Sequence, residues 1–295
     1  MNQLAIIGPT ASGKSDLSLK IALKIDAYIL SIDSLSIYKE IDIVSAKPSV
    51  DELSQVKHFG INVLNPNEYF SVDIFISLYK DLVKKCKKDK KNLVIVGGTS
   101  FYLKSLMQGL SALPVMSQEV KESVDKQLQN LTAVYDLLCQ KDAVYMKNID
   151  KNDSYRIEKA LLIYEASGVT PTEWFKDNPP EPIIEDLAIY NIEVSRDTIR
   201  ERIKKRTAKM LEMGLIDEVC LLEKKYSRLP HSMSSIGIVE VLDFLDGKIE
   251  KEEMSELISI HTAQLAKRQQ TFNKTQFVDV ISAPLEELEE IILSQ

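Results

Sequence analysis

The stretch that decides the fold is Gly8-Pro9-Thr10-Ala11-Ser12-Gly13-Lys14-Ser15, near the start of a chain of 295 residues. It fits the pattern G-x-x-x-x-G-K-[ST], a loop that cradles the phosphates of a nucleotide or a pyrophosphate. The apolar run from Leu4 to Ile7 precedes it and predicts a buried strand. After it, Leu17, Ile21 and Ile25 recur every four residues, which predicts one face of a helix. Strand, glycine loop and helix therefore follow in the order that a phosphate-binding loop requires.

The residue types of this loop suit a bound anion. The glycines let the backbone bend, and successive N–H groups and the helix N-terminus point at the anion. Lys14 is expected to meet outer phosphate oxygens, and the Ser15 hydroxyl to help hold Mg²⁺ as the cofactor. An ordinary glycine turn before a helix is the alternative, and the predicted strand and helix argue against it. We therefore expect residues 8–15 to bind a diphosphate or a nucleotide.

The composition is that of a soluble globular protein, with 44% hydrophobic and 27% charged residues. No apolar run approaches the ~20 residues that a membrane-spanning helix needs. The chain reaches its first predicted strand without a basic and apolar leader. The three cysteines and the three histidines are scattered, so the spacing suggests neither a disulfide framework nor a metal cluster. We expect a cytoplasmic monomer without a membrane partner.

The net charge of −7 argues against a general nucleic-acid coat. Phosphate contact is nevertheless decided by local clusters of basic residues. Such clusters occur at residues 84–91 (KKCKKDKK), 200–209 (RERIKKRTAK) and 267–274. The first is more typical of a solvated helix end than of a binding surface.

Two further apolar runs end in residues that could serve a site. Tyr28 to Ile32 is followed by Asp33-Ser34, and Leu93 to Val96 is followed by Gly97-Gly98-Thr99. In a parallel sheet the carboxyl ends of the strands form the ligand-binding edge. Asp33 could therefore be a general base or a partner of Mg²⁺, or it could cap the next turn, and its position alone does not decide. The alternation predicts an α/β fold, a P-loop parallel-sheet core flanked by helices.

The pattern changes at about residue 113. From residue 117 to 167 the periodicity is helical, four prolines then mark an irregular return, and a strand is expected at Leu187 to Val194. We therefore expect a core of residues 1–112 and 187–295, interrupted by an all-helical insertion at 113–186. Residues Met254 to Ala266 predict a helix that closes at Lys267-Arg268-Gln269, and Phe277 to Ile281 predicts the last strand.

The basic segment from Arg196 to Lys209 predicts a helix. Arg202 and Arg206 are four residues apart, so they share a face of this helix. Two guanidinium groups on one face suit a phosphate or a pyrophosphate. A solvated basic helix is the alternative.

Six segments, in one order, closely resemble those of the tRNA dimethylallyltransferases, also called tRNA isopentenyltransferases or the IPP transferase family. They are GPTASGKS (8–15), SIDSLSIYKEIDIVSAKP (31–48), FSVDIF (70–75), VGGTSFYL (96–103), RERIKKRTAKMLEMGLIDEV (200–219) and QLAKRQQTF (264–272). The resemblance runs from Gln3 to about Phe277, which is nearly the whole chain.

The resemblance implies an enzyme that transfers a dimethylallyl group from dimethylallyl diphosphate to tRNA. The acceptor would be the N6 amine of the adenosine 3′-adjacent to the anticodon, in tRNAs reading codons that begin with U. The adenine would be turned out of its stack to reach the pocket. By family likeness Asp33 is the base, and Thr10, Lys14, Ser15 and Arg206 surround the diphosphate. The residues implied to contact the tRNA anticodon stem-loop are Asp33, Ser34, Leu35, Ser36, Thr99, Lys121, Tyr155, Arg156, Ile157, Glu158, Lys159, Lys267, Arg268, Gln269 and Lys274.

The chain departs from the family pattern at a few positions. Val44 stands where glycine is usual, Ser234 and Ala263 where arginine is expected, and Ile238-Val239 replaces Tyr-[Lys/Arg]. These departures predict fewer contacts with tRNA but an intact catalytic set.

The residues alone leave two rival classes open. A P-loop small-molecule or nucleotide kinase would bind ATP but would not need the insertion. A non-enzymatic nucleic-acid-binding switch would have no use for Asp33.

Overall fold

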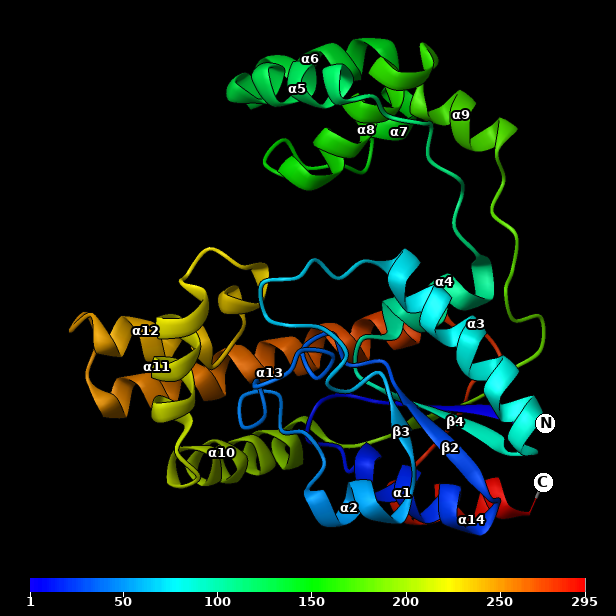
Figure 1. The fold of residues 1–295 in the computed structure, drawn as a ribbon, viewed down its shortest axis with the longest axis vertical. Coiled ribbons are helices and arrows are strands. Elements are labelled where there is room, and N and C mark those ends of the chain that lie inside the picture. Colours follow the sequence, from blue (N-terminus) through cyan, green and yellow to red (C-terminus); the bar gives the residue numbers. More distant parts are fainter. Residues whose placement is uncertain (295) are drawn as a thin grey trace. The chain divides into compact units, whose positions relative to one another are not determined.

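The computed structural model describes residues 1–294, which form two compact units (Figure 1). The first unit combines Met1–Leu106 with the chain from Glu185 onward, and the second is Met107–Ile184. The sequence predicts boundaries at residues 113 and 186. These two positions lie in residues 109–117 and 178–187, two segments that contain neither helix nor strand.

The first unit is built on a six-stranded sheet in the order β3-β2-β4-β1-β5-β6, in which every pairing is parallel. This confirms the predicted α/β class. Strand β1, in the interior of the sheet, carries Ala5, Ile6 and Ile7. All three are fully buried, as expected for a parallel strand covered on both faces. The strands are β1 (Gln3–Ile7), β2 (Ala27–Ser31), β3 (His58–Phe59), β4 (Asn92–Gly97), β5 (Ala188–Ile192) and β6 (Ile281–Ala283).

Helices lie on both sides of this sheet (Figure 1). Helices α1 and α14 pack with the strands into one apolar core that includes Leu17, Ile21, Leu288 and Ile292. In Figure 1, α3 lies on the other side. The helices of this unit are α1 (Lys14–Lys24), α2 (Val50–Gln55), α3 (Val72–Asp89), α4 (Ser100–Gln108), α10 (Arg196–Glu212), α11 (Leu215–Tyr226), α12 (Ile238–Leu245), α13 (Lys251–Gln276) and α14 (Leu285–Leu293).

A second apolar core of this unit forms away from the sheet. Ile37, Tyr38 and Ile41 from the loop after β2 are buried there among residues of α11, α12 and α13, such as Val219 and Met254. Burial of this kind contributes about 25 cal/mol per Å² of apolar surface removed from water. The core therefore fixes the loop after β2 as a packed part of the structure.

The second unit is helical. Its core contains Val124, Leu138, Ile157 and Leu161, contributed by α5, α6 and α8. Its α-helices are α5 (Gln118–Gln127), α6 (Leu131–Lys141), α7 (Ala143–Met146), α8 (Ser154–Ser167) and α9 (Pro171–Asp177). None of the helices within residues 1–294 has the length and apolar character that crossing a membrane would need.

Two predictions near the C-terminus are wrong. Helix α13 does not close at residues 267–269 but continues to Gln276. Basic residues typify a last helical turn, yet Lys, Arg and Gln are also strong helix formers, and neither glycine nor proline interrupts this stretch. The last strand is Ile281–Ala283 rather than 277–281, and Val278 is 85% exposed.

The chain after β5 forms two consecutive helices, α10 and α11, and α10 extends three residues beyond the predicted end at Lys209. The basic helix α10 ends at Glu212, and Gly214 adopts a left-handed φ of 97° before α11 begins. Only glycine takes this conformation without steric cost. The break turns α11 toward the loop after β2, which proves important for the site.

Candidate active site

The predicted phosphate-binding loop lies between β1 and α1, the order that the sequence predicts. Gly13, the residue before α1, has a φ of 95°, and a Cβ there would meet the Leu285 side chain at 3.0 Å. The Lys14 ammonium turns back onto the loop and donates to the Pro9 carbonyl at 2.6 Å. The loop is thus closed by its own lysine, and α14 supports it from outside.

The surroundings of Lys14 lower the pKa of its ammonium group. Desolvation lowers the pKa of Lys14 to about 7, an effect that the Asp33 carboxylate opposes and the Arg206 guanidinium reinforces. Burial also lowers the pKa of Arg206, against the influence of Asp33. An anion in this position would favour the charged form of both cations. The site is therefore suited to a di- or polyphosphate.

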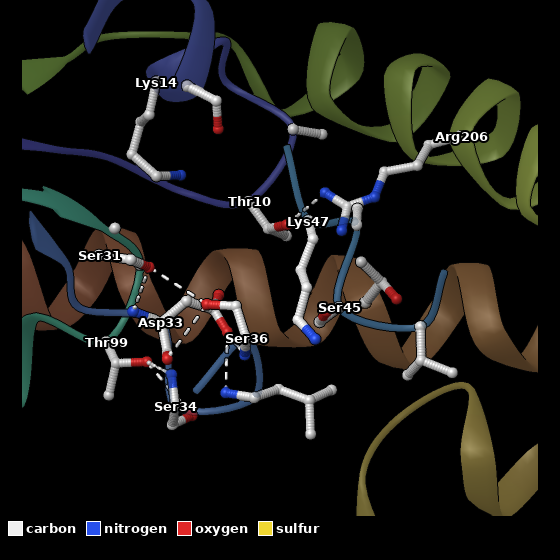
Figure 2. A pocket seen from close by; sticks show the side chains of 18 of the residues that line it. Thr10, Lys14, Ser31, Asp33, Ser34, Ser36, Ser45, Lys47, Thr99 and Arg206 are labelled. Carbon is white, nitrogen blue, oxygen red and sulfur yellow. Dashed lines mark hydrogen bonds between the residues drawn. The ribbon is translucent and has the colours of Figure 1, made fainter. Parts of the chain in front are cut away.

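Arg202 and Arg206 share one face of α10, as their spacing predicts, and both contact the loop. Arg206 Nη1 donates to Thr10 Oγ1 at 3.1 Å. Arg202 Nη1 donates to the carbonyl oxygens of Ala11 and Ser12 at 3.4 and 3.2 Å. Arg202 thus holds the backbone of the loop, whereas Arg206 presents its charge beside the threonine hydroxyl (Figure 2).

Asp33 follows β2, and its two carboxylate oxygens differ in their surroundings. Its Oδ1 accepts from the backbone N–H groups of Leu35 and Ser36 at 2.9 and 3.1 Å, which is a turn cap. Its Oδ2 has no hydrogen-bond partner among residues 1–294, and the residue lines the main cavity. Next to it, the Ser34 N–H donates to Thr99 Oγ1 at 3.2 Å, which joins the ends of β2 and β4.

One cavity of about 650 Å³ collects these groups. Its size falls within the range of small-molecule sites. Its lining includes most of the predicted phosphate loop together with Asp33, Thr99 and Arg206 (Figure 2). The predicted site residues among its lining are Thr10, Ala11, Gly13, Lys14, Ser15, Asp33, Ser34, Leu35, Ser36, Thr99, Arg206 and Gln269.

The oxygen atoms available in the cavity suit a Mg²⁺ ion that is bound mainly by the phosphates of a substrate. Among residues 1–294 no three His, Cys, Asp or Glu side chains gather as a metal cage. Ser15 stands at the start of α1, and it lines the cavity together with the open carboxylate oxygen of Asp33. Mg²⁺ commonly binds through one or two protein oxygens and the phosphates of a substrate.

Two further residues of the cavity support its loops, one from far away in the sequence and one from nearby. Gln269 of α13, expected only at tRNA, accepts the Thr10 N–H at 2.7 Å across 259 residues. A Cβ at Gly98 would lie 2.3 Å from the amide nitrogen of Gln269, so a larger residue there would displace this side chain. Lys47 donates to Tyr38 O, Asp42 Oδ1 and Asn62 Oδ1 at 2.6, 2.7 and 2.7 Å. No local sequence signal could assign Thr10 as the partner of Gln269.

The remaining predicted tRNA contacts lie outside the cavity. Lys267, Arg268 and Lys274 are exposed on α13, in the first unit. Lys121 and the segment 155–159 belong to the second unit. One of these assignments needs correction, because Ile157 is fully buried in the core of that unit, where its side chain stabilises α8.

Val44 takes a negative φ, and its side chain is 6% exposed. The backbone there is one that any residue can adopt, so valine in place of the usual glycine leaves the loop conformation unstrained.

Comparison with known proteins identifies the family of the chain. A family model described as IPP transferase matches residues 36–276. The tRNA dimethylallyltransferase of Sulfurimonas denitrificans is 67% identical over 294 residues, 100% of this chain and 99% of the relative. That of Sulfurovum sp. is 54% identical, and the alignment covers 99% of this chain and 98% of the relative.

Solved structures show the same fold. A tRNA isopentenylpyrophosphate transferase from Staphylococcus epidermidis aligns with a TM-score of 0.71 and 30% identity, covering 100% of this chain and 98% of that one. A eukaryotic dimethylallyltransferase acting on tRNA aligns with a TM-score of 0.85 at 22% identity, covering 97% of this chain and 74% of that one. From the match to the family model and the close full-length relatives, the chain belongs to the IPP transferase family.

Proposed function

We propose that this chain transfers the dimethylallyl group of dimethylallyl diphosphate to the N6 amine of the adenosine 3′-adjacent to the anticodon. The tRNAs concerned are those reading codons that begin with U. The observation that carries the proposal is that one cavity joins the glycine-rich loop, two cations and a carboxylate oxygen that has no hydrogen-bond partner within residues 1–294. Its volume of about 650 Å³ gives room for a prenyl diphosphate and a base turned out of its stack.

The leaving group is stabilised by the loop. Lys14 and Arg206 face the developing charge of the pyrophosphate, an interaction that strengthens as the bond breaks. Arg206 donates to Thr10 Oγ1, so the hydroxyl proton of Thr10 remains to be donated elsewhere. We assign it to the oxygen that bridges the diphosphate and the prenyl group.

The acceptor amine is deprotonated by Asp33. The lone pair of N6 forms a bond to the first prenyl carbon while the bond from that carbon to oxygen breaks. The pyrophosphate leaves with the electron pair, and the N6 proton passes to Asp33 Oδ2. The turn that Asp33 caps through Oδ1 keeps this second oxygen in place.

We propose that Ser15, with Asp33 nearby in the same cavity, holds Mg²⁺ against the diphosphate oxygens. The ion would supply further positive charge to the departing pyrophosphate.

Contacts with the tRNA anticodon stem-loop would be made by basic residues of each unit, all exposed except the half-buried Lys159. We assign this role to Lys267, Arg268 and Lys274 of α13 and to Lys121, Arg156 and Lys159 of the second unit. Because phosphate contact depends on local clusters, a net charge of −7 does not oppose this grip. We propose a cytoplasmic setting and a monomeric enzyme, since one chain carries every group that the reaction needs.

The test is incubation of the protein with Mg²⁺, labelled dimethylallyl diphosphate and a tRNA transcript, followed by nucleoside mass spectrometry. We expect one five-carbon unit on the adenosine beside the anticodon. A transcript with guanosine at that position is the matched control and should stay unlabelled. Transfer of phosphate from labelled ATP to a small molecule, with no label in tRNA, would contradict the proposal and favour a kinase.

A further inference from the structure

The segment that follows Ile41 is held by a single carboxylate from a distant helix. Glu218 Oε2 accepts from the backbone N–H groups of Asp42 and Ile43 at 3.0 and 2.8 Å. Its Oε1 accepts from the Val44 N–H at 3.0 Å. Successive N–H groups turned to one side form an anion-binding nest, and here the protein fills the nest with its own side chain.

The clamped segment forms part of the cavity wall. Val44, Ser45, Ala46 and Lys47 all line the cavity that contains Asp33 and the phosphate loop. Figure 2 shows Ser45 and Lys47 among the side chains of this pocket. Lys47, whose side chain is 5% exposed, donates in turn to Asp42 Oδ1. Glu218 therefore holds the wall in two ways. It binds the backbone N–H groups of residues 42–44, and it fixes the position of Asp42, whose carboxylate accepts from Lys47.

The helix that carries Glu218 is itself rigidly placed. Glu218 lies in the first turn of α11, where an acidic side chain is favoured by the helix dipole. Its neighbours Leu215 and Val219 are fully buried in the second core of the first unit. Removing the carboxylate would leave three backbone donors without their partner, and charge-assisted hydrogen bonds of this kind are among the stronger ones.

We propose that Glu218 is a positioning residue for prenyl transfer, which it serves by fixing residues 42–47 as the cavity wall beside the reacting groups. Glu218 itself is not among the residues that line the cavity. The inference rests on the proposed function for its kinetic part, whereas the clamp itself can be measured without any activity.

The kinetic test compares Glu218→Ala with the wild-type enzyme. Misplacement of a positioning element by about 1 Å can cost on the order of 100-fold, so we expect kcat to fall roughly 10- to 100-fold. Inhibition by inorganic pyrophosphate should stay within about twofold, because the phosphate loop and Arg206 do not depend on the clamp. A fall in pyrophosphate affinity equal to the fall in kcat would overturn the positioning role.

Two further variants separate the clamp from a general loss of charge. Asp217→Ala removes the neighbouring exposed carboxylate and should leave kcat within about twofold, as is usual for surface changes. Glu218→Gln keeps one oxygen acceptor and should lie between alanine and wild type. Equal losses in Asp217→Ala and Glu218→Ala would overturn the proposal.

Rescue by a small anion gives the sharpest readout. Formate added to Glu218→Ala can refill the nest, and we expect it to restore kcat severalfold while leaving wild type and Asp217→Ala unchanged. No rescue at any formate concentration that wild type tolerates would count against the clamp.

Hydrogen exchange tests the clamp independently of the reaction. The amides of Asp42, Ile43 and Val44 should be protected in wild type and exchange faster in both Glu218 variants. If the alanine variant does not fold, the comparison rests on the glutamine variant. Unchanged protection would overturn the inference, whereas loss of protection in an enzyme that does not prenylate tRNA would leave the clamp standing and reject only the proposed function.

Discussion

The phosphate loop and the wall segment at residues 42–47 line one cavity, but they depend on the rest of the chain to different degrees. The loop is eight consecutive residues, and Lys14 closes it by donating a hydrogen bond to Pro9, five residues earlier in the chain. The wall is held by Glu218, which lies 174 to 176 residues away. Arg202 and Gln269 also contact the loop from distant helices, but its glycine and lysine pattern can be recognised locally, whereas the wall segment has no such pattern.

The difference teaches that a catalytic group can belong to either kind of region. Lys14 and Thr10 lie in the locally built part, whereas Asp33 begins the loop that the distant helices α11, α12 and α13 bury. Changes in the first region should therefore affect the diphosphate directly. Changes in the second should affect the chemistry while the diphosphate still binds.

The largest effect is expected at Asp33. Asp33→Ala should reduce turnover by roughly 10²–10⁴-fold, the usual contribution of a general base. Asp33→Asn is the sharper variant, because its amide oxygen can still accept from the Leu35 and Ser36 N–H groups while it takes up no proton. Steady-state prenylation of a tRNA transcript measures both. Turnover of either variant within threefold of wild type would reject Asp33 as the base.

The next effect should come from the loop side. Arg206→Ala should slow transfer by roughly 10²–10³-fold, the range seen when one donor to a developing anion is removed, and should weaken pyrophosphate binding. Arg200→Ala is the matched control, since that arginine is exposed on the same helix and pairs with Asp197 at 3.5 Å. If the two variants behave alike, α10 is a solvated helix and not a pyrophosphate clamp.

The sequence predicts most of what is locally encoded. The strands β1, β2 and β4 and the phosphate loop follow from short apolar runs and one glycine pattern, each legible within a dozen residues. Helix α14 and the two-residue strand β3 were not expected, because short elements take their stability from tertiary packing rather than from propensity. The length of α13 was underestimated for a related reason: a basic cluster looks alike at the end of a helix and on its exposed face.

The site divides in the same way. The cap role and the open oxygen of Asp33 could both be proposed from its position after a strand. The contacts of Gln269 with Thr10 and of Glu218 with residues 42–44 could not, because nothing in either segment encodes a partner more than 170 residues away. Such pairings depend on the packing of the whole unit.

A smaller effect concerns pH and Lys14. Because the pKa of Lys14 is lowered to about 7 in the free protein, the lysine is neutral above that pH and must take up a proton when a diphosphate binds. Pyrophosphate affinity should therefore fall as pH rises, by a factor approaching tenfold per unit above pH 7. Calorimetry in two buffers of different ionisation enthalpy would show the proton uptake.

The matched control for this effect is Lys14→Arg, which stays charged throughout the range. Its affinity for pyrophosphate should decline less with pH than that of wild type. A parallel decline in the two proteins would assign the pH dependence to the ligand and not to Lys14.

The smallest effect concerns the binding of tRNA, for which we propose residues outside both the phosphate loop and the wall segment. Replacing Lys267 and Arg268 with alanine should flatten the log–log dependence of tRNA affinity on salt by about 1–2 units, since each lost phosphate contact removes about 0.7–0.9 of the slope. Lys87 and Lys88 of α3 are the control, because they too are exposed and adjacent. Pyrophosphate binding should be unchanged in both double variants. If the slopes of both variants equal that of wild type, Lys267 and Arg268 only solvate α13; if the α3 variant flattens the slope instead, the basic cluster at residues 84–91 binds the tRNA.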